Sequence, residues 1–276
     1  MVLVLYDPSW RGQGIPGLAP RRDGSANAPG RPRAGSAPQT TSECSRHPGG
    51  TLVIMASVLS LNIGRITPTE HATPGETGID KRPVPGPVAV TAPGPKGVGG
   101  SGLAGDRIRD LRHHGGDDQA VYAYAAEDLD AWAAELGREL RPGMFGENLT
   151  TVGLDVTGAL IGERWRVGPQ VVLEVTTARI PCRTFAGWLG EKRWVRRFTE
   201  RGVPGSYLRV IVPGEIRAGD GIEVLHRPDH DVTVGVAFRA LTTDRDLLPR
   251  LLAARALHPE ALAQAEKGEP IVLDGP

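Results

Sequence analysis

The amino-acid sequence predicts a mainly β fold, a barrel or sandwich with peripheral helices and a small helical appendix near the C-terminus. Short runs that read as strands recur at 55–62, 87–90, 120–124, 164–167, 171–175, 207–212 and 222–226. Gly-containing turns separate the later runs, and many short strands with turn signals at modest spacing are typical of barrels and sandwiches. The chain has no Gly-rich turn that leads from a strand into a long helix, so Rossmann and P-loop folds find no support.

Two helices are predicted beside these strands. Between Glu127 and Leu136 apolar residues recur at i, i+3, i+4 and i+7, which gives one apolar face, and Gly137 follows at the C′ position. We assign this face to core packing. The basic stretch 191–200 predicts the second helix, whose cations either face solvent or steer an anionic ligand.

The C-terminal part is predicted to form three short helices. Thr243 fits the N-cap of a helix that ends at Leu248. Pro249 and Pro259 fit the first turns of a second and a third helix, because proline is tolerated there. We therefore divide the folded part into a β domain at 56–230 and a helical extension at 231–276.

The N-terminal segment 1–55 is expected to be disordered. Its residues from 7 to about 50 are mostly Pro, Gly, Arg, Ser and Ala, and such a composition buries too little apolar area to offset its conformational entropy. Met55 stands directly before the first predicted strand. We expect the upstream part to be an over-extended reading frame, and a peptide from 1–50 in the native protein would contradict this.

Charge and cysteine content indicate a cytoplasmic protein. Lysine plus arginine and aspartate plus glutamate both number 32, so overall charge argues for neither a nucleic-acid polymer nor a membrane surface as partner. No apolar run approaches the length that spans a bilayer. The two cysteines, one of them in the N-terminal segment, leave no disulfide framework, which fits a reducing compartment.

Cys182 is the residue on which the functional prediction centres. It is the only cysteine in the predicted folded part, and Pro181 before it should end the preceding strand. Arg179 and Arg183 flank it, and nearby guanidinium groups favour the thiolate, which attacks electrophiles and binds metals. The alternative is a small buried structural cysteine.

Two further loops carry candidate ligand-binding residues. In the first, Arg112, His113 and His114 precede Gly115 and Gly116, and glycine N–H groups beside such side chains make a candidate anion pocket. A tight turn with one histidine bonded to the backbone is the alternative. No second cluster has the ligand spacing of a structural zinc site, and no G-x-S-x-G elbow supports a serine hydrolase, although a pairing of Cys182 with one of the histidines stays open.

The second loop spans 142–151 and contains two glycines, which allow close backbone approach to a ligand. Glu147, Asn148 and Thr150 offer directional hydrogen bonds in it. An ordinary connection is the alternative reading of this stretch.

Taken in order, these pieces resemble the MOSC domain, which occurs at the C-terminus of molybdenum-cofactor sulfurases and in stand-alone bacterial proteins. Their order and separation match the stand-alone bacterial subfamily with a C-terminal three-helix extension, which residues 232–267 resemble, and the likeness covers roughly 56–270. The matching stretches are Gly105-Asp106, His113-His114-Gly115-Gly116 leading into 120–124, Pro142-Gly143 with Phe145-Gly146-Glu147-Asn148-Leu149-Thr150, and Arg179-Ile180-Pro181-Cys182.

The resemblance implies a MOSC-type β-barrel that binds the molybdenum cofactor (molybdopterin), with Cys182 as the metal ligand and catalytic residue; pyridoxal phosphate is not expected. Relatives of this type reduce N-hydroxylated compounds such as 6-hydroxylaminopurine, with electrons from a partner redox protein, so the implied function is an oxidoreductase that detoxifies N-hydroxylated bases. A soft thiolate suits a redox-active metal, and the cofactor's phosphate and pterin need cations and amides. The implied cofactor contacts are Arg112, His113, His114, Gly115, Gly116, Glu147, Asn148, Thr150 and Arg179.

One loop departs from the family pattern. It reads Asp117-Asp118-Gln119, where relatives commonly have Pro, an acidic residue, then Lys or Arg. If that cation meets the cofactor phosphate, Gln119 removes it and Asp117 adds an opposing charge, which Arg112 or the basic helix would have to offset. The alternative function is a sulfur-carrier or cofactor-handling module with a persulfide on Cys182, and a third is a binding domain with no redox role.

Overall fold

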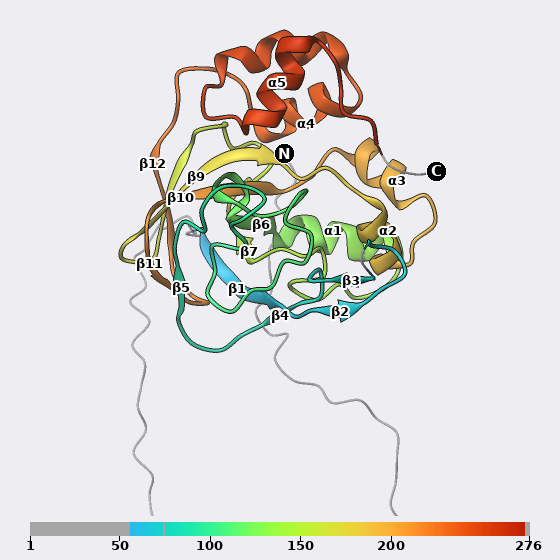
Figure 1. The fold of residues 1–276 in the computed structure, drawn as a ribbon. Coiled ribbons are helices and arrows are strands. Elements are labelled where there is room, and N and C mark those ends of the chain that lie inside the picture. The colour runs from blue at the N-terminus through green and yellow to red at the C-terminus, as the bar shows by residue number, and fades with distance from the viewer. Residues whose placement is uncertain (1–55, 74, 274–276) are drawn as a thin grey trace, which may run out of the picture. The chain divides into compact units, whose positions relative to one another are not determined.

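The computed structural model describes residues 56–73 and 75–273, and its centre is one eight-stranded mixed sheet (Figure 1). The expected disorder and over-extension of 1–55 lie outside the described residues. The strand order is β12-β8-β9-β10-β6-β7-β1-β4. These strands are β1 (Ser57–Gly64), β4 (Lys81–Pro83), β6 (Val121–Ala125), β7 (Leu149–Val152), β8 (Arg164–Val167), β9 (Val171–Ala178), β10 (Ser206–Val212) and β12 (Ile222–His226).

Neighbouring strands of the large sheet pair antiparallel except β6 and β7, which pair in parallel. A parallel pair needs a crossover, and helix α1 (Ala126–Leu136) supplies it. Two small sheets accompany the large one. They join β11 (Gly214–Ile216) to β5 (Val88–Val90), and β2 (Thr67–Pro68) to β3 (Glu76–Thr77).

The large sheet has β12 and β4 at its ends, and these two strands do not pair within the described residues. A single isolated bridge, between Ser57 and Gly221, connects the start of β1 with the start of β12. The predicted mainly β architecture is thus present as a large mixed sheet with several helices. Closure into a barrel is not confirmed.

The predicted strands at the seven apolar runs correspond to β1, β5, β6, β8, β9, β10 and β12. The predicted helix before Gly137 is confirmed as α1, and Gly137 caps it in the left-handed conformation at φ 64°. The basic helix appears as α3 (Trp194–Arg201), shifted by a few residues. Helix α2 (Arg183–Leu189) was not predicted, because its first residue follows Cys182 without a side-chain cap.

The first C-terminal helix lies earlier in the chain than predicted. Helix α4 (Val234–Thr242) begins after Thr233, whose Oγ1 accepts a hydrogen bond from the Val236 N–H at 3.1 Å. Thr243 stands at the C-cap instead, so its assignment as an N-cap is wrong. The predicted helices on either side of Pro249 form one 3₁₀ segment, η2 (Arg245–Ala253), and α5 (Pro259–Lys267) starts at its proline as expected.

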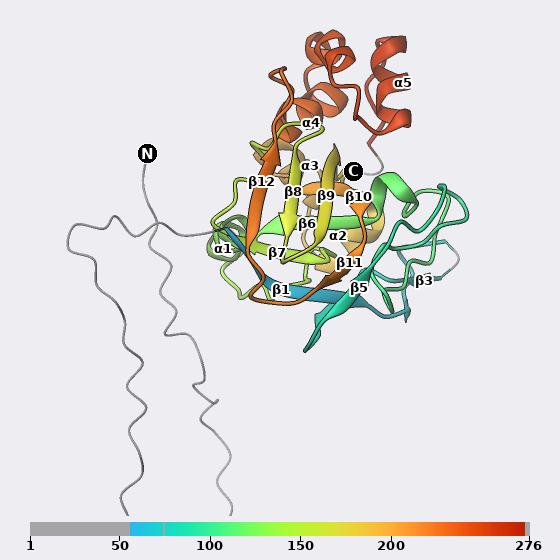
Figure 2. The ribbon, with the colours of Figure 1, turned by 90° about the vertical axis from the view of Figure 1, so that its left-hand side faces the viewer.

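The C-terminal helices share the core of the sheet. Aromatic rings from Trp132, Phe145, Phe185, Trp194 and Phe198 pack together with centroids 4.6 to 6.4 Å apart. The Phe238 ring of α4 joins them edge-to-face at 6.2 Å from the Phe198 ring. Figure 2 shows α4 and α5 grouped at one end of strands β8, β9 and β12. Among the described residues, no helix has the length and apolar character that crossing a membrane requires.

Candidate functional site

A cavity of about 980 Å³ opens where β9 ends, and Cys182 lies in its wall. We call it the Cys182 cavity. Its lining comes from four parts of the chain that are far apart in sequence: 71–73 with 76–81, 107–114 with Gln119, 177–184, and several residues between Leu241 and Val272. Single residues such as Tyr122 and Tyr207 lie between them. The cavity therefore exists only when the sheet and the C-terminal helices are assembled.

Cys182 stands in extended conformation directly before α2, and its carbonyl accepts the Ala186 N–H at 3.0 Å. Strand β9 ends at Ala178, three residues before Pro181, which agrees with the expected strand end. The thiol is free and partly exposed. It is neither the fully buried structural residue of the alternative reading nor a surface group.

Arg179 is buried beside Cys182 and is held by aromatic rings. It donates a hydrogen bond to the Phe145 carbonyl, and its guanidinium carbon lies 3.7 Å from the Phe185 ring centroid and 5.4 Å from that of Tyr122. Burial alone would lower the pKa of Arg179, but the Tyr122 and Tyr207 phenols and the Cys182 thiol raise it overall. The side chain is thus a fixed cation in the cavity wall.

The histidine loop brings His114 to the cavity as a neutral group. Burial, and next the positive charge of Arg179, lower the pKa of His114 to about 4, so the imidazole is uncharged at pH 7. His113 and Arg112 also line the cavity, although both side chains are mostly exposed and both contact Asp110, His113 with its Nδ1 2.9 Å from Oδ2.

Gly115 and Gly116 do not line the cavity. The Gly116 N–H donates to the Gly100 carbonyl at 3.0 Å, so it does not face a ligand, contrary to the expected exposed glycine N–H groups. Both glycines have φ of 80°, and a Cβ at Gly116 would lie 2.7 Å from the Lys96 backbone. They let two loops pack closely, and their part in cofactor binding stays a prediction.

Glu147 and Thr150 are fully buried and also lie outside the cavity lining. The Glu147 carboxylate accepts hydrogen bonds from the Gly143 and Phe145 N–H groups and from the Thr150 hydroxyl. The two side chains thus shape the turn that carries Phe145, the acceptor for Arg179. Direct contact with a cofactor stays a prediction for both.

Asn148 does line the cavity, and it belongs to a buried polar cluster with Lys81 and Asp106. Asp106 pairs with Lys81, and it accepts from the Asn148 amide at 2.9 Å and from the Gly64 N–H at 2.6 Å. Burial alone would raise the pKa of Asp106, but the charge and hydrogen bonds around it, those of Lys81 above all, lower it. Lys81 was missed by the sequence reading, since it stands alone in a short strand.

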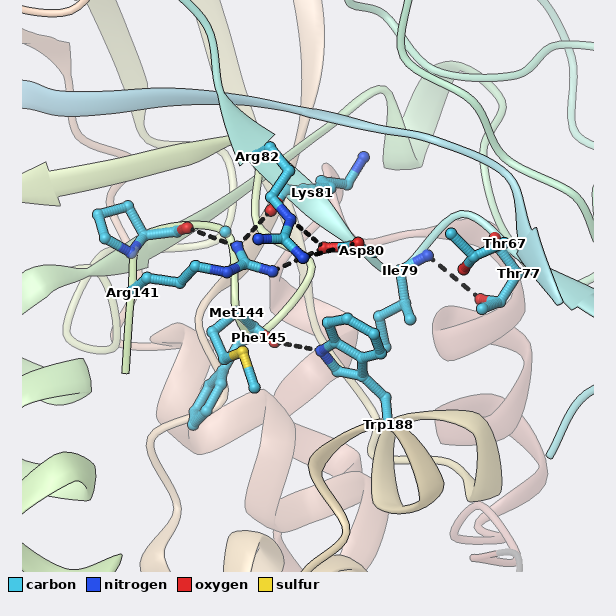
Figure 3. Close-up of polar contacts among 12 residues, drawn as sticks. Thr67, Thr77, Ile79, Asp80, Lys81, Arg82, Arg141, Met144, Phe145 and Trp188 are labelled. Carbon is cyan, nitrogen blue, oxygen red and sulfur yellow. Dashed lines mark hydrogen bonds and ion pairs between the residues drawn. The ribbon is translucent and has the colours of Figure 1, made fainter. Parts of the chain in front are cut away.

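The neighbouring wall segment at Thr77, Ile79 and Lys81 is fixed by a second set of contacts, drawn in Figure 3. Asp80 accepts hydrogen bonds from Arg82 and from Arg141, each at 2.6 Å. Arg141 also donates to the Lys81 carbonyl, which ties the 141–147 loop to β4. The wall therefore does not depend on a ligand for its position.

Positive charge dominates the lining, which has seven lysines and arginines against three carboxylates, Glu76, Asp110 and Glu260. Four of the cations pair with carboxylates. Arg107, Arg179 and Arg183 have no carboxylate partner within residues 56–73 and 75–273. The cavity thus suits an anionic ligand, as expected from sequence, although Lys81 and Lys96 come from segments that no local motif identifies.

The structure does not place at the cavity all the charged groups that were expected to act on a cofactor phosphate near Gln119. The stretch Lys192–Arg197 does not line the cavity, and Arg197 pairs with Glu135 at 2.7 Å. Asp117 does not line it either, because its carboxylate accepts the Gly94 N–H at 2.8 Å. Gln119 itself faces the cavity. Of the two compensating groups considered, only Arg112 lines the cavity with it.

Comparison with known proteins gives consistent matches. The model of the MOSC domain matches residues 110–223. The uncharacterized protein YflK of Bacillus subtilis is 36% identical over 184 residues, which cover 66% of this chain and 79% of YflK. YiiM of Escherichia coli is 31% identical over 162 residues, 56% of this chain and 71% of YiiM.

A protein of Gibberella moniliformis named as a reductase is 32% identical over 176 residues, 62% of this chain, but the match spans only 29% of that protein. Among solved structures, YiiM from Geobacillus stearothermophilus superposes with a TM-score of 0.62 and 24% identity, covering 77% of this chain and 98% of that one. This likeness shows the fold.

Proposed function

Because the chain belongs to the MOSC domain family, we propose that it is a molybdenum-cofactor-dependent reductase of N-hydroxylated compounds, with 6-hydroxylaminopurine as an example of its substrates. The observation that carries the proposal is the placement in one cavity of the Cys182 thiol and of three arginines that have no carboxylate partner in the part of the chain that the structure describes. A relative named as a reductase supports the reaction type.

The residues present fit the cofactor. A thiolate is a suitable ligand for a soft metal, and Cys182 would hold the molybdenum. Arg107, Arg179 and Arg183 would face the anionic phosphate, for which guanidinium groups make charge-assisted hydrogen bonds. No group of three or more His, Cys, Asp or Glu side chains is arranged for a metal ion within the described residues.

When bound, the cofactor would supply two electrons to the reaction, in which the N–O bond of the substrate breaks, one proton leaves with the hydroxyl as water and a second proton ends on the nitrogen. Arg179 stays charged and orients the negative part of the ligand. His114 is neutral at pH 7 and can accept or donate a hydrogen bond without adding charge. The electrons would come from a partner redox protein.

The test is elemental analysis together with turnover. Protein purified from a host that makes the cofactor should contain molybdenum and reduce 6-hydroxylaminopurine in the presence of a chemical electron donor. Cys182→Ala should lose both, while Cys182→Ser should lose activity with less effect on folding. Molybdenum and activity retained in Cys182→Ala would remove the thiol from the mechanism.

The same experiment separates the alternative function. A persulfide detected on Cys182 by mass spectrometry, with no turnover of N-hydroxylated compounds, would favour the sulfur-carrier or cofactor-handling role. Absence of both molybdenum and persulfide from the purified protein would leave a binding domain without redox chemistry.

A further inference from the structure

The C-terminal helices contribute one wall of the Cys182 cavity, and part of this wall is apolar. Leu241 of α4, Ala261 of α5 and Ile271 after α5 all line the cavity. The Ile271 N–H donates to the Leu241 carbonyl at 2.8 Å, which fixes the segment after α5 against α4. Apolar side chains in such a wall suit the face of a flat ring better than a phosphate.

Two glutamines bring polar amide groups to the cavity. The Oε1 atoms of Gln119 and Gln264 are buried, and neither has a hydrogen-bond partner within the described residues. Both side chains line the Cys182 cavity. Buried polar groups in proteins are nearly always paired, so two orphans in one cavity call for a partner from outside the chain.

The structure brings the two glutamine-bearing elements together. Gln119 ends η1 (Asp117–Gln119), and Gln264 lies one turn after Glu260 on α5. Lys96 bridges them, because its backbone packs against Gly116 before η1 and its Nζ is 2.7 Å from the Glu260 carboxylate. A second link runs through Thr176, which donates to the Asp118 carbonyl at 2.6 Å and accepts the His258 N–H at 3.1 Å.

We propose that Gln119 and Gln264 recognise a flat nitrogen heterocycle that carries an exocyclic amine, with their amide oxygens accepting N–H hydrogen bonds from its edge and the Leu241–Ile271 wall covering its face. The inference deepens the proposed function and rests on it for the class of substrate. The inference also gives Gln119 a role other than that of a missing cation, because its uncharged amide would form a hydrogen bond with the edge of a ring. Two ligands share this chemistry, an aminopurine substrate and the pterin of the cofactor.

The test uses full-length protein purified from a host that makes the cofactor, titrated with adenine and with 6-methylpurine in a calorimeter. The two purines have the same size, but only adenine has an exocyclic amine. Wild-type protein should prefer adenine by about tenfold, the effect of one or two hydrogen bonds to otherwise unpaired buried acceptors. Gln119→Leu and Gln264→Leu should each reduce this preference, and Gln119→Glu, which keeps an acceptor at the same place, should retain it.

Gln170→Leu is the matched control, because Gln170 is exposed and bonds the Pro213 carbonyl outside the cavity. Its preference for adenine should equal that of the wild-type protein. The melting temperatures of Gln119→Leu and Gln264→Leu should equal or exceed that of the wild type, since an apolar side chain removes an unpaired buried oxygen. A merely structural role for the glutamines would lower them instead.

Molybdenum content of the same variants distinguishes the two ligands. Lost adenine preference with unchanged molybdenum identifies the substrate as the ligand, whereas reduced molybdenum without any adenine preference in the wild type identifies the pterin. Variants that change neither quantity overturn the inference. If such variants still reduce N-hydroxylated compounds, the glutamine inference fails and the proposed function stands. If the wild-type protein prefers adenine but does not turn over N-hydroxylated compounds, the proposed function fails and the glutamine inference stands.

Discussion

Arg179→Met tests whether the buried cation beside Cys182 serves ligand binding rather than folding. Methionine keeps a flexible, apolar side chain beside the Phe185 and Tyr122 rings and removes the charge, its cation–π contacts with those rings and the hydrogen bond to Phe145. We expect a large loss of bound molybdenum and a small change in the free energy of unfolding.

The magnitudes follow from the surroundings of Arg179. A unit negative charge about 5 Å from the guanidinium, at an effective dielectric constant of about 20, gains about 3 kcal/mol, so its loss weakens anion binding by roughly a hundredfold. On the stability side, the substitution loses a charge-assisted hydrogen bond of about 1.5–3 kcal/mol and ring contacts of up to about 2 kcal/mol. It also relieves a desolvation cost of several kcal/mol, so the net change should stay within about 2 kcal/mol.

The assay compares molybdenum per protein and urea unfolding for Arg179→Met and for Arg201→Met. Arg201 is a close control, because its guanidinium lies 4.4 Å from the Trp132 ring centroid and it pairs with Glu135 outside the cavity. The control should keep its molybdenum. Wild-type molybdenum content in Arg179→Met, at unchanged stability, would refute the assignment of this cation to the ligand.

Two further predictions concern stability. Burial raises the pKa of Asp128 to about 6, so the stability of the wild type relative to Asp128→Asn falls as the pH rises from about 4 through 6. The variant should be more stable by about 1–3 kcal/mol at pH 8 and nearly equal at pH 4 in urea unfolding, and an equal gain at both pH values would contradict this cause. Thr233→Ala should cost about 1 kcal/mol through the lost cap of α4, and Thr243→Ala less than about 0.5 kcal/mol; equal thermal shifts would contradict the observed helix start.

The strands could be predicted because their residues alternate or run apolar over short, turn-bounded stretches, as in β8 and β12. The start of α4 could not, because Thr233 and Thr243 are equally suitable caps in a local reading. The choice depends on Val234 and Phe238, which bury against the sheet and against Phe198. Tertiary packing therefore determines which of the two threonines stands at the N-terminus of α4.

Some residues of the candidate site could likewise be predicted from local sequence, and others could not. Cys182, Arg179 and His114 stand in recognisable stretches, and all three line one cavity. Lys81 could not be found, since it is an ordinary cation in an unremarkable segment and reaches the cavity through long-range contacts. Gln119 was noticed only as a missing charge, and its unpaired amide became visible with the cavity around it.

The buried cluster around Asp106 has a consequence for how the protein unfolds. Its partners Gly64, Lys81 and Asn148 belong to strand β1, strand β4 and the turn before β7, so no local segment can satisfy this carboxylate by itself. Releasing β4 would leave the buried Asp106 carboxylate without the Lys81 charge, and releasing β1 or the turn before β7 would remove one of its hydrogen bonds while it stays away from water, so each local opening is costly. Amide hydrogens in β1, β4 and β7 should therefore exchange with solvent at one common rate, through global opening and not through separate fraying of the cavity wall.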